Sequence, residues 1–516
     1  MDAIFDHAGP APCPQPFNLA GHVLGKASGL AGKTALKIVS AEAVERWSYG
    51  ALEQAVRGTA TGFLQRGLSG GDLVLLRLGN TVEFPIAFLA AISVGLVPVP
   101  LSAQLTGSEL SHILDELCPR AVVLDPELSG PELEPDRTGD TNPMEVISVQ
   151  TLREMQALPA AAYVMGSPER LAYLIFTSGT SGRPRAVMHA HRSIWAREMM
   201  HRDWLDLGPE DRILHAGAFN WSFTLGTGLM DPWRMGATAL IPAPGTHPQD
   251  LPALLRQHKA SVFAAVPGVY RKLLQSHAQL DLPDLRHGVA AGESLSQKMR
   301  DDWALATQGG LIHEAFGMSE CSTFLSASPA APAAPGHLGR PQSGRRVAIM
   351  GPEGPVAFGQ EGEIAIHRSD PGLMLGYYNA PEDTRARYRG DWFMTGDHAS
   401  MASDGQIKFS GRHDDMMNAG GYRVSPLEIE SAMAGHTAIK QIGVTEVEVK
   451  TDTKIIVAFY TADMPVPTEA LERYAASKLA RYKQPRAWVH LDHLPTNPNG
   501  KLARKQLALQ FPSADR

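Results

Sequence analysis

The chain has 516 residues, of which 44% are hydrophobic and 20% charged, as is typical of a globular protein too long for one simple core. Its 47 lysines and arginines against 54 aspartates and glutamates give a formal net charge of −7, so we expect neither a nucleic-acid partner nor binding to an anionic membrane. Three cysteines without paired spacing indicate neither a disulfide framework nor a zinc site.

The N-terminal region shows no pattern of export or membrane insertion. Residues 1–16 contain two aspartates and four prolines, and they lack the basic-then-apolar order of a signal peptide. The uncharged run at residues 84–102 approaches the length of a membrane span, but Pro85, Pro98 and Pro100 favour a helix followed by a strand. We therefore expect a cytoplasmic protein with no membrane span.

Strand-like and helical patterns alternate along the first part of the chain. Short apolar runs predict strands, and segments with helical periodicity separate them. This alternation indicates parallel sheets with helices on their faces, so the predicted fold class is α/β. The expected strands lie at 72–77, 96–101, 121–124, 171–176, 238–241 and 262–266, and the expected helices at 85–94 and 110–117.

The segment directly after the strand predicted at 171–176 combines hydroxyls, glycines and cations. Glycines let backbone N–H groups approach an anion closely, and hydroxyls add donors and a candidate metal ligand. A Walker A loop, and with it a P-loop kinase, is disfavoured because no Gly-Lys-Ser/Thr closes the segment. We predict that the segment binds phosphate. It reads Thr177, Ser178, Gly179, Thr180, Ser181, Gly182, Arg183, Pro184, Arg185.

Further motifs follow this loop in a fixed order. Taken alone, each has an ordinary interpretation as a turn, a helix start or a solvated loop. Their order and spacing relative to the loop favour function instead. They are Ala-Gly-Glu-Ser at 291–294, Phe-Gly-Met-Ser-Glu at 316–320, Thr-Gly-Asp at 395–397, Gly-Arg-His-Asp-Asp at 411–415, Gly-Gly-Tyr-Arg at 420–423 and Pro-Asn-Gly-Lys at 498–501.

Together the motifs resemble those of the AMP-forming acyl-CoA synthetases, the adenylate-forming family that includes luciferases and the adenylation domains of peptide synthetases. The family usually ends the loop with Pro-Lys-Gly, where this chain has Pro184, Arg185 and Ala186. Arginine keeps the charge but changes the donor geometry. The resemblance implies that ATP binds to Thr177, Ser178, Gly179, Thr180, Ser181, Gly182, Arg185, Gly292, Glu293, Ser294, Phe316, Gly317, Met318 and Ser319.

The resemblance also implies individual roles around the nucleotide. Phe316 would lie against the adenine. Glu320 would hold Mg²⁺ with help from Thr180, since carboxylate and hydroxyl oxygens are the ligands that magnesium prefers. Asp397 would accept hydrogen bonds from both ribose hydroxyls, and Arg412 would contact the ribose.

A second domain is expected after residue 411. Residues 1–411 are predicted to form a large N-terminal ATP- and acyl-binding domain of stacked, mostly parallel sheets with helices. Residues 412–516 are predicted to form a small mobile α+β domain, because a compact alternation of both element types follows. Its expected helices lie at 426–434 and 468–479, and its expected strands at 442–446, 455–460 and 487–491.

The small domain carries several of the functional groups that the resemblance implies. Lys501 would reach the carboxylate and the α-phosphate during adenylation, and Arg423 would face the triphosphate. Asp414 would be the hinge, and Gly421 would let the pantetheine arm of coenzyme A pass close to the backbone. The predicted catalytic residues are therefore Lys501, Arg423 and Glu320.

These roles imply a two-step reaction that uses ATP, Mg²⁺ and coenzyme A. A carboxylate and ATP first give an acyl-adenylate and pyrophosphate. The small domain then rotates, and the thiol attacks the activated carbonyl and releases AMP. One alternative is an enzyme that loads a separate carrier protein. Another is a catalytically silent nucleotide binder, against which the retained Glu320, Asp397, Arg412 and Lys501 argue.

The identity of the acid depends on residues 218–237, which line the acyl pocket in the family. Their sequence resembles the benzoate-CoA ligase branch, although Ala218 stands where that branch tends to have a lysine. Trp221 and Phe223 offer large apolar faces that either wall this pocket or belong to the core. We therefore favour an aryl or similarly compact acid, with a medium-chain acid as the alternative. A homodimer is left open.

Overall fold

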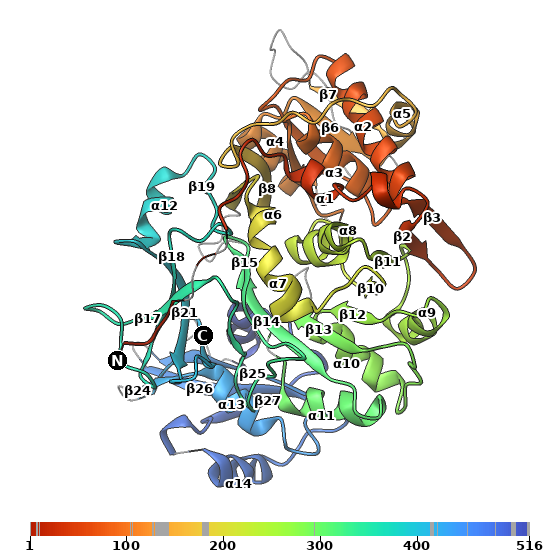
Figure 1. Ribbon diagram of the computed structural model, residues 1–516. Helices are drawn as coiled ribbons and strands as arrows, with labels where there is room; N and C mark the ends of the chain where they lie inside the picture. The colour runs from red at the N-terminus through yellow and green to blue at the C-terminus, as the bar shows by residue number, and fades with distance from the viewer. Residues whose placement is uncertain are drawn as a thin grey trace.

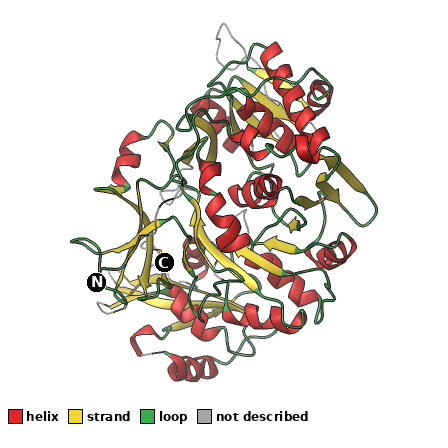
Figure 2. Cartoon of the chain, viewed as in Figure 1, coloured by secondary structure: helices red, strands yellow, loops and turns green. Residues whose placement is uncertain are grey.

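The computed structural model is a mixed α/β protein built from several sheets with helices packed between and around them (Figures 1 and 2). It describes residues 2–6, 9, 11–103, 105, 107–125, 128, 144–177, 185–293, 295–412, 417–419, 422–450, 453–479, 481–496 and 502–512.

A four-stranded sheet near the N-terminal end of the chain is parallel throughout. The uncharged run that approaches the length of a membrane span forms helix α3 and then strand β5, as the prolines predicted. Among the described residues no helix is both long and apolar enough to cross a membrane. The strands are β5 (Val97–Pro100), β4 (Leu73–Arg77), β6 (Ala121–Leu124) and β7 (Glu145–Ser148); nearby helices are α1 (Leu19–Val23), α2 (Tyr49–Gln65), α3 (Glu83–Ser93), α4 (Gly107–Leu117) and α5 (Val149–Met155).

A nine-stranded sheet runs through the centre of the molecule. Its strands from β14 to β2 pair in parallel, and antiparallel strands close both ends. In order across the sheet they are β16 (Arg340–Pro341), β15 (Ser322–Ser326), β14 (Ile312–Met318), β13 (His287–Ala291), β12 (Val262–Ala265), β10 (Arg212–His215), β11 (Thr238–Pro242), β2 (Thr34–Val39) and β3 (Val44–Ser48).

Helices connect and cover these strands, which is how parallel neighbours are normally joined. Two stretches wind as π-helix, namely His201–Leu205 and Thr224–Met230. The α-helices of this region are α6 (Ser193–Ala196), α7 (Glu198–Met200), α8 (Asp231–Met235), α9 (Leu251–Gln257), α10 (Pro267–Ser276) and α11 (Gln297–Ala306).

The predicted phosphate loop joins two strands of a small antiparallel sheet. Strand β8 (Leu171–Thr177) confirms the strand predicted before the loop, and β9 (Arg185–Ala190) returns beside it. Strand β19 (Gly376–Tyr377) pairs with β9 on its other side and leads towards helix α12 (Pro381–Ala386). Residues 178–184 of the loop itself lie outside the described residues.

Residues 346–412 add a sheet that is antiparallel rather than parallel. Short connections join β17 to β18, β20 to β21 and β21 to β22, and a crossover helix is needed only between parallel neighbours. A turn at Asp404-Gly405 joins two of them, and Gly405 has the positive φ of 85° that such a turn requires. The strands are β1 (Ile4–Asp6), β17 (Arg346–Met350), β18 (Glu361–His367), β21 (Trp392–Met401), β20 (Tyr388–Arg389) and β22 (Ile407–Arg412).

The C-terminal elements, at the blue end of the colour range in Figure 1, form the predicted α+β pattern with their own buried core. The predicted strand at 442–446 is longer than expected because it forms the hairpin of β25 with β26. The boundary at residue 411 stays a prediction. The elements are β23 (Met417–Ala419), β24 (Tyr422–Val424), α13 (Pro426–Met433), β25 (Gln441–Lys450), β26 (Thr453–Thr461), α14 (Thr468–Lys478), β27 (Ala487–His490) and α15 (Arg504–Leu507).

Candidate active site

The two ends of the predicted phosphate loop are fixed opposite each other. Thr177, the last residue of β8, is the cross-strand partner of Arg185, the first residue of β9. Arg185 forms an ion pair with Asp383 on α12, so its side chain is tied to a helix 198 residues further along the chain. The sequence did not indicate this pair, because nothing local links the two positions.

The predicted adenine and metal motif begins at the end of β14. Phe316 packs against Phe324 and Phe409, with ring centroids 5.7 and 5.1 Å apart. Gly317 lies at an irregularity of the β14–β15 pairing, where a Cβ atom would come within 2.2 Å of the Ser322 carbonyl oxygen. Only glycine fits there, so the backbone geometry of the motif depends on this residue.

Glu320 follows in the turn between β14 and β15. Its Oε1 accepts a hydrogen bond of 2.7 Å from the hydroxyl of Tyr377 on β19. Burial, and then the nearby Glu320 carboxylate, raise the pKa of this hydroxyl, which therefore stays protonated and donates. Tyr377 was missed by the sequence analysis. Its Gly-Tyr-Tyr context carries no pattern that distinguishes it from a core aromatic residue.

Asp397 and Arg412, the two predicted ribose contacts, are cross-strand partners on β21 and β22. Asp397 is 6% exposed, and its backbone N–H bonds to the hydroxyl of Thr395 at 3.1 Å. Gly396, between them, has a φ of 79°, and its N–H donates to Glu363 Oε1 at 2.7 Å. The Thr-Gly-Asp motif thus lies within β21, where side chains bind the backbone N–H groups of Gly396 and Asp397.

The remaining predicted nucleotide residues follow β13. Gly292 comes directly after this strand and has a φ of 95°, a conformation that favours glycine. Glu293 is half-buried beside it. Ser319 lies between Met318 and Glu320 and lines a small cavity described below. The ends of β13 and β14 therefore bring the two motifs to neighbouring positions, because these strands are parallel partners.

Trp221 and Phe223 both lie just before the π-helix Thr224–Met230 and are half-buried. The ring of Phe223 stacks on Trp204, with centroids 5.8 Å apart, and meets His215 edge-on at 4.5 Å. Phe223 therefore has one face on the core and is still partly exposed. Whether the exposed parts of the two side chains wall an acyl pocket stays a prediction.

A buried charge cluster lies beside this segment and was also missed by the sequence analysis. Arg197 donates to both carboxylate oxygens of Asp231, at 2.9 and 2.5 Å, and His201 Nε2 lies 3.1 Å from Asp231 Oδ1. Arg197 also donates to the hydroxyls of Thr227 and Ser322, at 3.1 and 2.6 Å. The sequence contained one signal of this cluster. Residues 213–230 carry no Asp, Glu, Lys or Arg, and Asp231 is the first such residue after this run.

The chain matches the AMP-binding enzyme family over residues 26–378 and the AMP-binding enzyme C-terminal domain over residues 428–501. It belongs to the AMP-binding enzyme family. This confirms the predicted AMP-forming acyl-CoA ligase and its use of ATP, Mg²⁺ and coenzyme A, and it confirms the predicted fold.

Related AMP-binding enzymes align with the chain over nearly its full length. A benzoate–CoA ligase of Thauera aromatica is 29% identical over 536 residues, which cover 98% of this chain and 99% of the relative. A 3-hydroxybenzoate–CoA ligase of Aromatoleum sp. (strain CIB) is 27% identical over 512 residues, which cover 95% and 96%.

Solved structures of the family have the same architecture. A benzoate CoA ligase from Burkholderia xenovorans LB400 superposes with a TM-score of 0.83 and 27% identity, covering 95% of this chain and 100% of that one. The anthranilate CoA ligase AuaEII in complex with anthranoyl-AMP gives a TM-score of 0.87 at 24% identity, covering 96% and 98%, which is a likeness in fold.

The described part of this AMP-binding enzyme fits Mg²⁺ held together with ATP. No cluster of three or more His, Cys, Asp or Glu that could hold a metal ion occurs among the described residues. Magnesium is commonly held by one or two carboxylates together with substrate phosphates, and Glu320 offers such a carboxylate in the turn after β14.

Nine of the predicted site residues fall on parts of the chain that the structure does not describe. Ser178, Gly179, Thr180, Ser181, Gly182, Ser294, Asp414, Gly421 and Lys501 lie outside the described residues. Arg423 is placed by its backbone on β24, opposite Asn418 of β23. The roles predicted for all of these residues stay predictions.

Proposed function

We propose that the chain is an aryl-CoA ligase, which activates a benzoate-like carboxylic acid as its adenylate and transfers the acyl group to coenzyme A. The observation that carries the acid class is the near full-length alignment with benzoate and hydroxybenzoate ligases. The half-buried aromatic side chains of Trp221 and Phe223 support it, and Phe223 packs against the cluster that contains Ala291 of the Ala-Gly-Glu motif. A cytoplasmic location and a homodimer stay predictions from the sequence.

In the first step the large domain positions ATP, and an oxygen of the acid attacks the α-phosphorus. Asp397 and Arg412 bind the ribose, and their position as cross-strand partners on β21 and β22 supports a shared ribose contact. Glu320 and Thr180 would hold Mg²⁺, which neutralises phosphate charge when it is bound. The charge of Lys501 would be needed between the carboxylate and the α-phosphate, where two anions must approach each other. Pyrophosphate leaves as the new P–O bond forms.

In the second step the small domain turns about Asp414 and withdraws Lys501. Gly421 then lines the path of the pantetheine arm. The thiol sulfur attacks the carbonyl carbon, the thiol proton is lost to solvent, and the C–O bond to AMP breaks. AMP and the acyl-CoA thioester are the products.

Pyrophosphate release across an acid panel, with and without coenzyme A, tests this function. The panel contains benzoate, substituted benzoates, hexanoate and acetate. We expect pyrophosphate with aryl acids in both conditions and an aroyl-CoA only when coenzyme A is present. Preference for hexanoate would overturn the aryl assignment in favour of the medium-chain alternative. Pyrophosphate without any thioester would indicate a carrier-loading enzyme.

Trp221→Ala is expected to change the order in which acids are preferred. If Trp221 walls the pocket, truncation makes room for bulkier acids, and one methylene of fit is worth about tenfold in kcat/KM. The measurement is kcat/KM for benzoate, a 4-alkyl benzoate and hexanoate in the parent and the variant, with melting temperatures. The matched control is Trp47→Ala, a partly buried tryptophan on β3 in another part of the chain. A uniform loss for all acids with a lower melting temperature would instead place Trp221 in the core.

Tyr377→Phe is expected to weaken the magnesium-dependent part of ATP binding by about tenfold or more. The lost hydroxyl donates to Glu320 Oε1 and fixes the carboxylate, and loss of such an orienting partner typically weakens metal affinity 10–100-fold. Calorimetric titration with ATP at high and low Mg²⁺ measures it. The control is Tyr378→Phe, the neighbouring tyrosine. Equal changes in the two variants, or a change that persists without Mg²⁺, would contradict this role.

A further inference from the structure

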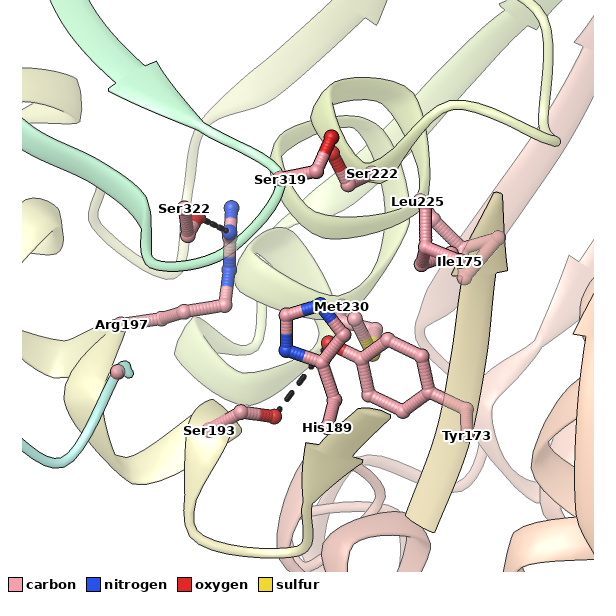
Figure 3. A pocket seen from close by; sticks show the side chains of 11 residues that line it. Tyr173, Ile175, His189, Ser193, Arg197, Ser222, Leu225, Met230, Ser319 and Ser322 are labelled. Atoms are coloured by element: carbon pink, nitrogen blue, oxygen red, sulfur yellow. Dashed lines mark hydrogen bonds between the residues drawn. The ribbon is translucent and has the colours of Figure 1, made fainter. Parts of the chain in front are cut away.

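A cavity of about 20 Å³ lies between the acyl segment 218–237 and the turn that carries Glu320 (Figure 3). Ile175, Leu225 and Met230 form its apolar walls. The polar side chains around it are those of Tyr173, His189, Ser193, Arg197, Ser222, Ser319 and Ser322. Since about 10–15 Å³ suffices for one water, the cavity has room for one water-sized group.

If the cavity is empty, the buried ring of His189 on β9 lacks hydrogen-bond partners among the described residues, which is unfavourable. It is 3% exposed, and no described residue meets full hydrogen-bond geometry with either ring nitrogen, although the Ser319 backbone lies close enough to favour the charged ring. Its ring stacks on Tyr173, with centroids 4.7 Å apart and planes at 14°, so its edge rather than its face is left for polar contacts. Burial lowers the pKa of His189 to about 4, so at neutral pH the ring offers one donor and one acceptor.

Arg197 supplies a complementary donor from the opposite side. Its Nε and Nη2 bind Asp231 and Thr227, and Nη1 uses one hydrogen for Ser322 at 2.6 Å. An arginine has five N–H groups, so Nη1 carries one more than these contacts use. Gly226 packs closely against the guanidinium group of Arg197, because a Cβ atom at this position would lie 2.3 Å from the guanidinium carbon. This close packing restricts the position of the guanidinium group.

Charge decides what kind of group this donor attracts. The Arg197 charge is already balanced by Asp231, whose carboxylate is fully buried against it. A second carboxylate on the substrate would therefore enter a buried site without a counter-charge, which is costly. A neutral group that both donates and accepts meets no such penalty.

We propose that this cavity takes a hydroxyl group carried by the acid substrate, which donates to His189 and accepts from Arg197 Nη1. The proposal rests on the proposed function and deepens it from an aryl acid to a hydroxylated aryl acid. A hydroxyl satisfies both polar walls with one oxygen, and buried polar groups are costly when left without partners. An ordered water is the competing occupant.

The test compares kcat/KM for benzoate with that for 2-, 3- and 4-hydroxybenzoate. In the parent protein we expect one isomer to exceed benzoate by about tenfold or more, because unsubstituted benzoate leaves the polar walls unpaired. In His189→Leu and in Ser322→Ala this ratio is expected to fall towards one. Each ratio compares two acids on the same protein sample, so a smaller folded fraction cancels.

The matched control is His258→Leu. His258 is also a buried histidine, 8% exposed, with an Nε2 atom that no described residue binds, and it does not line the cavity. This variant is expected to keep the parent ratio. Equal kcat/KM for benzoate and all three isomers, or a ratio that His189→Leu leaves unchanged, would assign the cavity to water and overturn the inference alone. Failure to activate any aryl acid, with turnover of hexanoate, would overturn the proposed function and this inference with it.

Discussion

Lys501→Ala is expected to lower the rate of acyl-adenylate formation by about 10²–10³-fold and to leave thioester formation from a supplied acyl-adenylate close to the parent rate. The lysine charge is needed only where the carboxylate meets the α-phosphate, and loss of one group that stabilises developing charge typically costs this much. Once the adenylate exists, the two anions are already joined. Pyrophosphate release reports the first step, and CoA-dependent consumption of synthetic acyl-adenylate reports the second.

Lys505→Ala is the matched control, because it removes an exposed lysine four residues further on, in α15 of the same C-terminal region. We expect it to leave both half-reactions within about twofold of the parent, as is usual for substitutions of exposed residues. Equal losses in the two half-reactions of Lys501→Ala would contradict its assignment to adenylation.

The strands and the nucleotide motifs could be predicted because their signals are local. A parallel strand buried on both faces reads as a continuous apolar run, and β4 and β12 are of this kind. The motifs at Gly292 and Phe316 come together because parallel strands end at the same edge of a sheet. Asp397 and Arg412 meet for a different reason, since a hairpin turn at Gly405 fixes the register of β21 and β22.

The partners of the site residues could not be predicted, because each contact joins distant parts of the chain. Tyr377 reaches Glu320 across 57 residues, and Asp383 reaches Arg185 across 198. No periodicity or spacing links such positions, and only the packing of β19 and α12 against β9 brings them together. The pairing of the other strands in residues 346–412 was not predicted for a related reason, since pairing direction depends on how strands are connected.

The buried ion pair of Arg197 and Asp231 lies beside the acyl segment, and it contributes to the stability of the fold at the site. Asp231 is 0% exposed and Arg197 5% exposed, so the ion pair is removed from water. Burial opposes ionisation of Asp231, but Arg197 and His201 hold its pKa below its usual value, so it remains charged at neutral pH. Each charge depends on the other for its compensation.

Asp231→Ala is therefore expected to lower the free energy of unfolding by about 3–5 kcal/mol, because it leaves Arg197 buried without a carboxylate. Urea denaturation followed by tryptophan fluorescence measures the change, since the buried Trp204 and Trp233 lie in the same part of the fold. The double variant Arg197→Met with Asp231→Leu should recover most of the loss, because replacing both members of a buried pair with apolar groups is often neutral.

The control for this prediction is Asp302→Ala, which removes the partner of Lys298 from an exposed i,i+4 pair on α11. Exposed pairs contribute little, so we expect a change of about 0.5 kcal/mol or less. A loss in Asp231→Ala no greater than in Asp302→Ala would mean that water reaches Arg197 when the carboxylate is removed. A double variant as unstable as Asp231→Ala would mean that the shape of the cluster, and not its unbalanced charge, sets the cost.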